Sequence, residues 1–124
     1  MFNRIRALAI YVTDIKRAKT FYTTVLDFEA STDIEPNIVF LKSKDITLYL
    51  EGGKTSAATD SESSRLSFFL QAEASAFQPY TALKKRGAVL LQKAPEKLGE
   101  DTYWFQIKDP DGNIIEVTGT GDGV

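Results

Sequence analysis

The chain has 124 residues, of which 43% are apolar, 11% aromatic and 26% charged, a globular composition that excludes disordered, collagen-like and low-complexity proteins. It contains no cysteine and no histidine, which excludes disulfides, thiolate nucleophiles, zinc ribbons, iron–sulfur centres and every histidine-based triad or metal site. Fifteen Lys and Arg against seventeen Asp and Glu give a net charge of −2 without a basic block, so we expect no nucleic-acid partner.

The first half of the chain predicts a strand, a helix and two further strands. Residues 7–12 form a short β-branched and aromatic run that is typical of a strand. Thr13 and Asp14 offer oxygens that can cap a helix, and apolar residues recur at helical spacing over residues 15–26. Residues 37–42 and 46–51 predict two strands joined by a turn.

The N-terminal segment shows no targeting or membrane signal. Its apolar run covers only residues 7–12, and Asp14, Lys16 and Arg17 follow directly. A signal peptide or a bilayer span needs a longer apolar stretch. We therefore expect a cytoplasmic, soluble protein with no membrane partner.

The second half repeats the order of elements. Residues 65–70 predict a strand, and Phe77, Tyr80 and Leu83 follow at helical spacing between a capping Ser75 and a terminating Gly87. Because proline is tolerated only in the first turn of a helix, Pro79 predicts that this helix starts late or bends.

Three more strands complete this half. Residues 88–92 predict one strand, and residues 103–108 and 113–118 flank Asp109-Pro-Asp-Gly112. Proline and glycine in that tetrapeptide suit a type I turn that closes a hairpin.

The chain is therefore expected to be a single domain, 1–124, with a weak internal repeat in the order of its elements. Module one covers residues 1–51 and module two covers residues 65–118. The segment 52–64, rich in Gly, Ser, Thr and Ala, predicts a linker. Residues 119–124 predict a loose tail.

Alternation along the strands separates two faces of the predicted sheets. One face is wholly apolar and is expected to lie under the helices. The opposite face mixes small, polar and aromatic residues, among them Tyr11, Tyr49 and Phe69. Such a face is either the wall of a wet cavity or an ordinary solvated sheet face, and the three aromatic residues favour the cavity.

Two motifs carry a resemblance to a known family. The first runs from Leu8-Ala-Ile-Tyr-Val-Thr-Asp14 to Val25-Leu-Asp-Phe28, and the second from Phe105 to Val117 through the Asp-Pro-Asp-Gly turn. They resemble the strand, helix and closing hairpin of the vicinal oxygen chelate superfamily, the glyoxalase and bleomycin-resistance fold, except that Asp27 stands where a glycine is usual. The resemblance implies an α+β fold of two βαβββ modules forming a half-open barrel-like cup, usually as a homodimer.

The resemblance also implies where a metal would be bound. Metal-dependent members of the superfamily use four ligands, typically two histidines and two acidic residues. The matching positions here hold Ala7, Tyr49, Arg65 and Glu116, of which only Glu116 is a usual ligand type. Alanine has no ligand atom and arginine is a permanent cation. We therefore expect no metal and no cofactor, which argues against glyoxalase I, extradiol dioxygenase and metal-dependent fosfomycin-modifying activity.

Each of these cup residues has more than one possible role. Arg65 and Glu116 would face each other either as a vestigial salt bridge or as a pair that orients a polar ligand group. Tyr49 is either an aromatic wall or a general acid. Trp104 either stacks on a planar ligand group or belongs to the core or a dimer interface. The identity of any catalytic residue stays open.

The favoured function is a metal-independent small-molecule binding protein of the glyoxalase/bleomycin resistance type. It would sequester an amphipathic ligand, such as an antibiotic or a metabolite, against Tyr11, Tyr49, Arg65, Phe69, Trp104 and Glu116. The alternative is a metal-free lyase or isomerase in which Glu116 is the base and Arg65 stabilises developing charge. A third possibility is a degenerate fold retained for protein–protein contacts.

Overall fold

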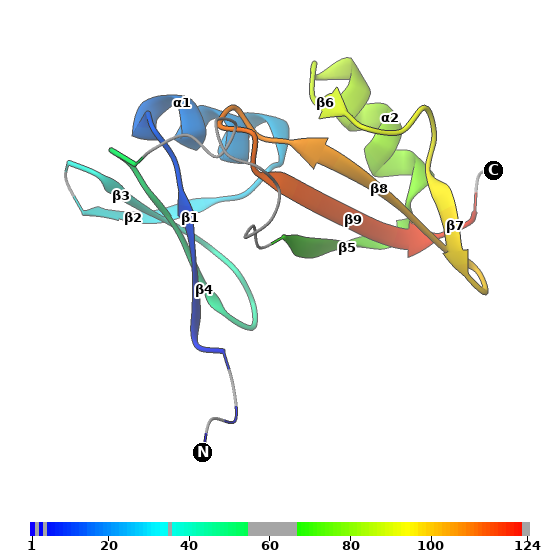
Figure 1. Cartoon of the computed structure of the whole chain (residues 1–124), viewed down its shortest axis with the longest axis horizontal. Coiled ribbons are helices and arrows are strands. Elements are labelled where there is room, and N and C mark those ends of the chain that lie inside the picture. Colours follow the sequence, from blue (N-terminus) through cyan, green and yellow to red (C-terminus); the bar gives the residue numbers. More distant parts are fainter. Residues whose placement is uncertain (2, 4, 35, 55–66, 123–124) are drawn as a thin grey trace. The chain divides into compact units, whose positions relative to one another are not determined.

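The computed structural model describes residues 1, 3, 5–34, 36–54 and 67–122 (Figure 1). The chain divides into two compact units, Met1–Asp60 and Ser61–Val124, which are described separately. Arg65 and most of the predicted linker lie outside the described residues.

Unit 1 is a four-stranded mixed sheet with a helical segment. Its strand order is β1-β4-β3-β2, with β1 parallel to β4 and the other pairs antiparallel. The elements are β1 Ala7–Tyr11, α1 Ile15–Thr20, the π-helical turn η1 Phe21–Val25, β2 Ala30–Ile34, β3 Ile38–Leu41 and β4 Thr47–Glu51.

The helical segment begins as the sequence predicts. Asp14 caps α1, because its Oδ1 accepts hydrogen bonds from the backbone N–H of Lys16 at 3.0 Å and of Arg17 at 3.1 Å. Ala18 and Tyr22 are fully buried, and α1 contacts β3 and β4. The last turn widens to π-helical geometry, which the apolar spacing alone does not predict.

Asp27 explains why a glycine is usual directly after this helical segment. Its φ is 65°, in the left-handed region that a side chain disfavours and that glycine adopts without strain. Aspartate tolerates this conformation better than most residues. An aspartate therefore holds the left-handed turn that follows η1 in this chain.

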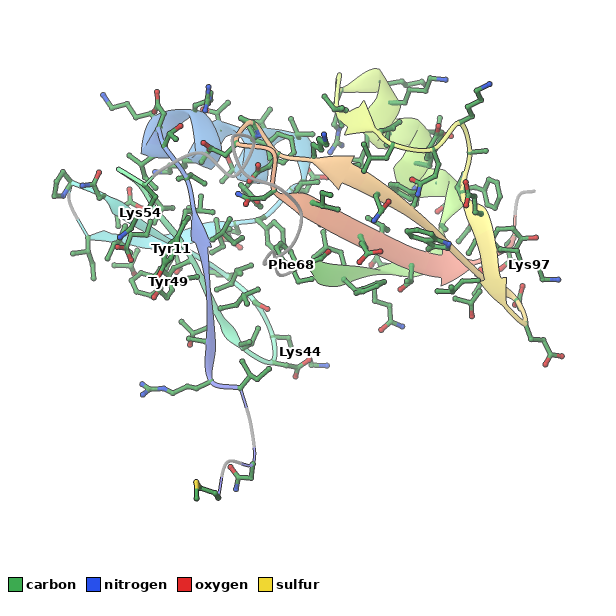
Figure 2. All side chains as sticks on the ribbon, in the orientation of Figure 1. Tyr11, Lys44, Tyr49, Lys54, Phe68 and Lys97 are labelled. Carbon is green, nitrogen blue, oxygen red and sulfur yellow. The ribbon has the colours of Figure 1, made fainter. Side chains whose placement is uncertain are left out.

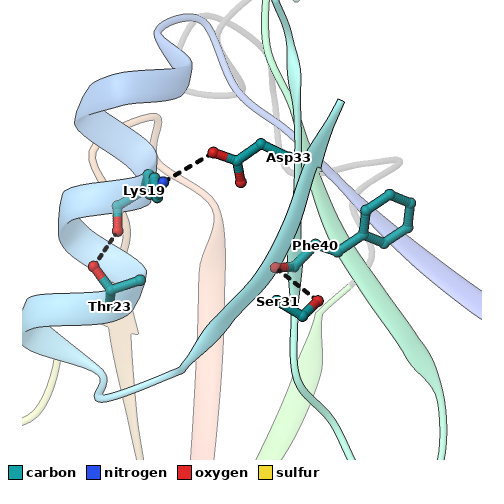
Figure 3. Close-up of polar contacts among 5 residues, drawn as sticks. All are labelled: Lys19, Thr23, Ser31, Asp33 and Phe40. Carbon is teal, nitrogen blue, oxygen red and sulfur yellow. Dashed lines mark hydrogen bonds and ion pairs between the residues drawn. The ribbon is translucent and has the colours of Figure 1, made fainter. Parts of the chain in front are cut away.

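Strand β2 was not predicted from the sequence. Its residues are mostly polar and exposed, and it forms the edge of the sheet beside β3. Lys19 Nζ lies 3.0 Å from Asp33 Oδ2, and Ser31 Oγ donates to the Phe40 carbonyl at 3.4 Å (Figure 3). The strand thus depends on contacts with α1 and β3 rather than on its own hydrophobic pattern.

Unit 2 is a five-stranded mixed sheet with one helix. Its strand order is β5-β9-β8-β6, and β7 also pairs with β8; β5 runs parallel to β9. The elements are β5 Phe68–Ser75, α2 Phe77–Lys85, β6 Val89–Leu90, β7 Glu96–Gly99, β8 Thr102–Lys108 and β9 Ile114–Thr120.

Gly87 ends α2 as predicted, but the predicted cap Ser75 lies one residue before the N-cap position. The N-cap residue is Ala76, which makes no side-chain capping hydrogen bond, while Ser75 Oγ accepts a hydrogen bond from the Phe77 N–H at 3.0 Å. Gly87 has a φ of 82° and follows the last turn. Pro79 is the third residue of α2, so it lies in the first turn, as the predicted late start of this helix requires, and its missing N–H has no partner to lose there.

Several strand boundaries in unit 2 differ from the prediction. β5 continues to Ser75, β6 has only two residues, and β7 was not predicted at all. β9 includes Gly119 and Thr120, so these residues are not part of a loose tail. The extra length of β5 and β9 comes from their mutual pairing, in which Ser75 lies opposite Thr120.

The predicted turn between β8 and β9 is confirmed. Asp109 is buried, and its Oδ1 accepts the N–H groups of Asp111 at 2.9 Å and Asn113 at 2.8 Å. The Gly112 N–H donates to the Asp109 carbonyl at 3.0 Å, and Gly112 has a φ of 84°. One buried carboxylate therefore organises the whole hairpin connection.

The predicted apolar faces supply part of the core of each unit: Ile10, Leu48, Leu50, Ile115 and Val117 are buried, Phe68 and Leu70 are half-buried, and Leu66 lies outside the described residues. In unit 1 the buried strand residues are Ile10, Val39, Leu41, Leu48 and Leu50, and in unit 2 they are Phe105, Ile107, Ile115 and Val117. Each unit carries its helix and its strands in the predicted order, so the α+β class is confirmed. No helix in the described ranges is long and apolar enough to cross a bilayer.

Candidate ligand-binding surfaces

The exposed face of the unit 1 sheet carries a row of aromatic side chains. Tyr49 pairs with Ala9 on one side and with Phe40 on the other. The Phe40 and Tyr49 rings are in contact, with centroids 5.5 Å apart. Tyr11 is 54% exposed. A face with small residues beside large exposed rings offers a flat apolar platform.

Lys54 adds a positive charge to this platform. Its Nζ forms an ion pair with Glu51 Oε2 at 2.9 Å and lies 4.9 Å from the centre of the Tyr11 ring (Figure 2). The hydrogen bond from Lys54 to Glu51, with the negative charge of that carboxylate, raises the pKa of Lys54 above its ordinary value. The ammonium therefore stays charged beside the Tyr11 ring.

The exposed face of the unit 2 sheet combines aromatic and polar residues. Glu116 in β9 pairs with Phe69 in β5 and with Gln106 in β8. Trp104 pairs with Thr118, so it points to the same face as Glu116. Phe69 is 56% exposed and Trp104 is half-buried.

Glu116 is held in a polar network on that face. Gln106 Nε2 lies 3.4 Å from Glu116 Oε1, and Ser67 Oγ lies 3.1 Å from Glu116 Oε2. Gln106 is positioned in turn by Gln92, whose Oε1 accepts the Gln106 N–H at 2.8 Å. Ser67 Oγ also lies 3.1 Å from the Ile114 carbonyl, so its single hydrogen is shared between two acceptors.

The structure brings most of the predicted site residues onto two surfaces. Tyr11 and Tyr49 share the exposed face of unit 1, while Phe69, Trp104 and Glu116 share that of unit 2. Trp104 is half-buried whereas its neighbour Phe105 is fully buried, and the role of Trp104 stays a prediction. Arg65 lies outside the described residues, so its pairing with Glu116 stays a prediction.

Three residues of these surfaces were missed from the sequence: Phe40, Lys54 and Gln106. Two-residue alternation along residues 37–42 and 103–108 would have placed Phe40 and Gln106 on the exposed faces. No such signal in the sequence predicts the position of Lys54. This residue follows β4, and a hydrogen bond from its backbone N–H to the Val12 carbonyl determines where it lies.

The residues at the family's metal-binding positions do not fit a divalent ion. Ala7 has no ligand atom. Glu116 has both oxygens within hydrogen-bonding distance of the side chains of Ser67 and Gln106. Among the described residues no group of three or more acidic side chains is placed to hold a metal. A divalent ion prefers several such oxygens.

Comparison with known proteins decides the family. The model of the Glyoxalase/Bleomycin resistance protein/Dioxygenase superfamily matches residues 4–117. The chain belongs to this superfamily. No curated protein sequence matches the chain.

Solved structures of the superfamily share the fold. A lactoylglutathione lyase from Agrobacterium tumefaciens has a TM-score of 0.74 and 22% identity, covering 94% of this chain and 92% of its own. The antibiotic-binding protein TnmS3 from Streptomyces sp. CB03234 has a TM-score of 0.73 and 20% identity, covering 97% and 98%. The fosfomycin resistance protein FosX from Listeria monocytogenes, complexed with Mn(II), has a TM-score of 0.73 and 15% identity, covering 97% and 93%.

Proposed function

We propose that this superfamily member is a metal-independent binding protein that sequesters an amphipathic small molecule, such as an antibiotic or a metabolite. The observation that carries the proposal is the exposed set of aromatic residues on sheet faces that also hold positioned polar groups. Phe69 and Tyr11 are each more than half exposed. The fold is shared with an antibiotic-binding protein and a fosfomycin resistance protein.

The physical basis of binding is burial of these rings. Covering exposed apolar surface is favourable by about 25 cal/mol per Å², and aromatic rings add a preference for planar partners. The side-chain amide of Gln106, whose Oε1 accepts from Gln92 Nε2 at 3.1 Å, and the carboxylate of Glu116 are held by neighbours, so they lose little freedom when they orient a ligand. This combination suits a ligand with a planar apolar part and a few polar groups.

The polar network favours binding over metal-free catalysis. A base that abstracts a proton must reach it directly. Both oxygens of Glu116 already lie near donors on Ser67 and Gln106. This arrangement supports a role for Glu116 in orienting a polar group, in preference to the lyase or isomerase alternative.

Trp104 allows a direct test, because it is the single tryptophan of the chain. We expect its fluorescence to respond saturably to at least one member of a panel of bleomycin and planar aromatic antibiotics. Since the proposed binding needs no metal, EDTA should leave the affinity unchanged. The same ligand at about one hundred times its Kd should add about 2.7 kcal/mol to the free energy of unfolding.

A matched pair of variants tests whether the ligand binds on the exposed face of unit 2. Phe69→Ala should weaken binding about tenfold, the effect of removing one aromatic contact of about 1.4 kcal/mol. Leu98→Ala is the control, since Leu98 is equally exposed at 56% but lies on β7, which pairs with β8 and not with β9, the strand of Glu116. Binding that requires added metal, or no binding across the panel, would contradict the proposal.

We also propose that the protein is a homodimer. Strands β2 and β5 are at sheet edges, and an edge without a partner is open to pairing with another chain. Light scattering at tens of micromolar protein should give twice the 13.8 kDa of one chain. A mass equal to one chain at that concentration would contradict the dimer.

A further inference from the structure

Unit 1 contains a basic pocket that adjoins the exposed aromatic face and shares Phe40 with it. It has a volume of about 660 Å³ and lies around the turn between β3 and β4. Three cations line it, Arg6, Lys42 and Lys44, against one carboxylate, Asp45. A local excess of positive charge is unexpected in a chain with a net charge of −2.

The backbone brings these cations together from separate parts of the chain. Arg6 precedes β1, and its carbonyl accepts the Thr47 N–H at 3.1 Å, which ties it to the start of β4. Lys44 projects from the turn between β3 and β4 (Figure 2). The pocket therefore combines cations from two segments that are far apart in the sequence, the residue before β1 and the turn between β3 and β4.

Of the three cations that line the pocket, Lys42 is the one that forms an ion pair with another described residue. Lys42 Nζ lies 3.1 Å from Glu29 Oε1, so its charge is already matched. No ion pair involves Arg6 or Lys44 within the described ranges. Two like charges that line one pocket repel each other, and an anion bound between them relieves that repulsion.

The rest of the lining suits an organic molecule rather than a bare ion. Phe40 and Ile46 contribute apolar surface, and hydroxyl groups come from Ser43 and Thr47. The guanidinium of arginine can hold a carboxylate or phosphate through two parallel hydrogen bonds. The volume falls within the range of about 300–1,000 Å³ of small-molecule sites.

We propose that the basic pocket binds a small organic oxyanion, with Arg6 and Lys44 on the carboxylate or phosphate group and Phe40 against an apolar body. This site lies within unit 1 and is separate from the polar network around Glu116. It does not rest on the proposed function.

The test is an amide NMR titration of the full chain with phenyl phosphate, benzoate and inorganic phosphate. Phenyl phosphate should shift the signals of residues 42–47 saturably and should bind tightest, because it joins a dianion to an apolar ring. Arg6→Gln and Lys44→Gln should each weaken it about tenfold. Lys97→Gln is the control, because Lys97 is an exposed lysine on β7 of unit 2 (Figure 2), and it should retain full affinity.

Three results would overturn the proposal. Absence of saturable shifts at residues 42–47 would exclude the pocket, and an equal loss of affinity in Lys97→Gln would show non-specific charge attraction. Inorganic phosphate binding as tightly as phenyl phosphate would exclude an organic ligand. Thermal unfolding of Arg6→Gln and Lys44→Gln verifies that both variants are folded. The Trp104 response to antibiotics in these variants reports separately on the proposed function.

Discussion

Replacing Gly119 by alanine is expected to lower the free energy of unfolding by on the order of 3 kcal/mol, as for a severe overpacking change. A Cβ at this position would lie 2.6 Å from the Ala76 nitrogen and 2.7 Å from the Ala74 oxygen. These are backbone atoms at the junction of β5 and α2, so they cannot move aside as the end of a flexible side chain does. The substitution must therefore displace β9 from that junction.

Urea denaturation of the variant measures this effect. Gly99→Ala is the matched control, because Gly99 also lies in a strand and its added Cβ would meet no atom within 4 Å. Its free energy of unfolding should change by less than about 0.5 kcal/mol. Gly119→Ala with a stability close to that of Gly99→Ala would contradict the close approach of the backbone segments.

Replacing Phe105 by alanine is expected to cost about 3–5 kcal/mol of stability. Phe105 is fully buried in β8, and its ring meets that of Tyr80 edge to face, with centroids 5.2 Å apart. The Tyr80 hydroxyl donates to the Gln92 carbonyl at 2.7 Å, which restrains Tyr80 from filling the space. The cavity therefore stays largely open, and the lost contacts are not replaced.

The contrast with Phe69 makes this prediction specific. Phe69→Ala removes the same side chain from a position that is 56% exposed, so it should change the free energy of unfolding by less than about 1 kcal/mol. Phe69→Ala should also weaken ligand binding, whereas Phe105→Ala should change binding only by lowering the stability of the fold. Equal destabilisation by the two substitutions in urea denaturation would contradict the assignment of the two faces.

Much of the fold follows from local patterns in the sequence. The cap at Asp14, the stop at Gly87 and the turn at Asp109 each act on neighbouring backbone groups, so their chemistry is local. The β2 and β7 strands were missed because their residues are mostly polar and exposed. Such strands exist only by pairing with β3 and β8, and that pairing is not written in their own periodicity.

The candidate surfaces, like the fold, could be predicted from the sequence only in part. Alternation along the strands correctly placed Tyr11, Tyr49 and Phe69 on exposed faces, since side chains of a strand point to opposite sides in turn. It did not show that Gln106 and Ser67 meet Glu116, because Ser67 is 49 residues from Glu116 and no rule of spacing connects them. The position of the Arg65 side chain opposite Glu116 remains a prediction from the family resemblance.

The sequence by itself determined the superfamily, much of the order of elements and the two-faced character of the strands, because these depend on residue type and local spacing. Only the tertiary structure decided which side chains share a surface. Strand register places Trp104 on the face of Glu116, and the β1–β4 pairing brings Arg6 to the turn that carries Lys44. Both depend on contacts between residues far apart in the chain, which form only when the sheets assemble.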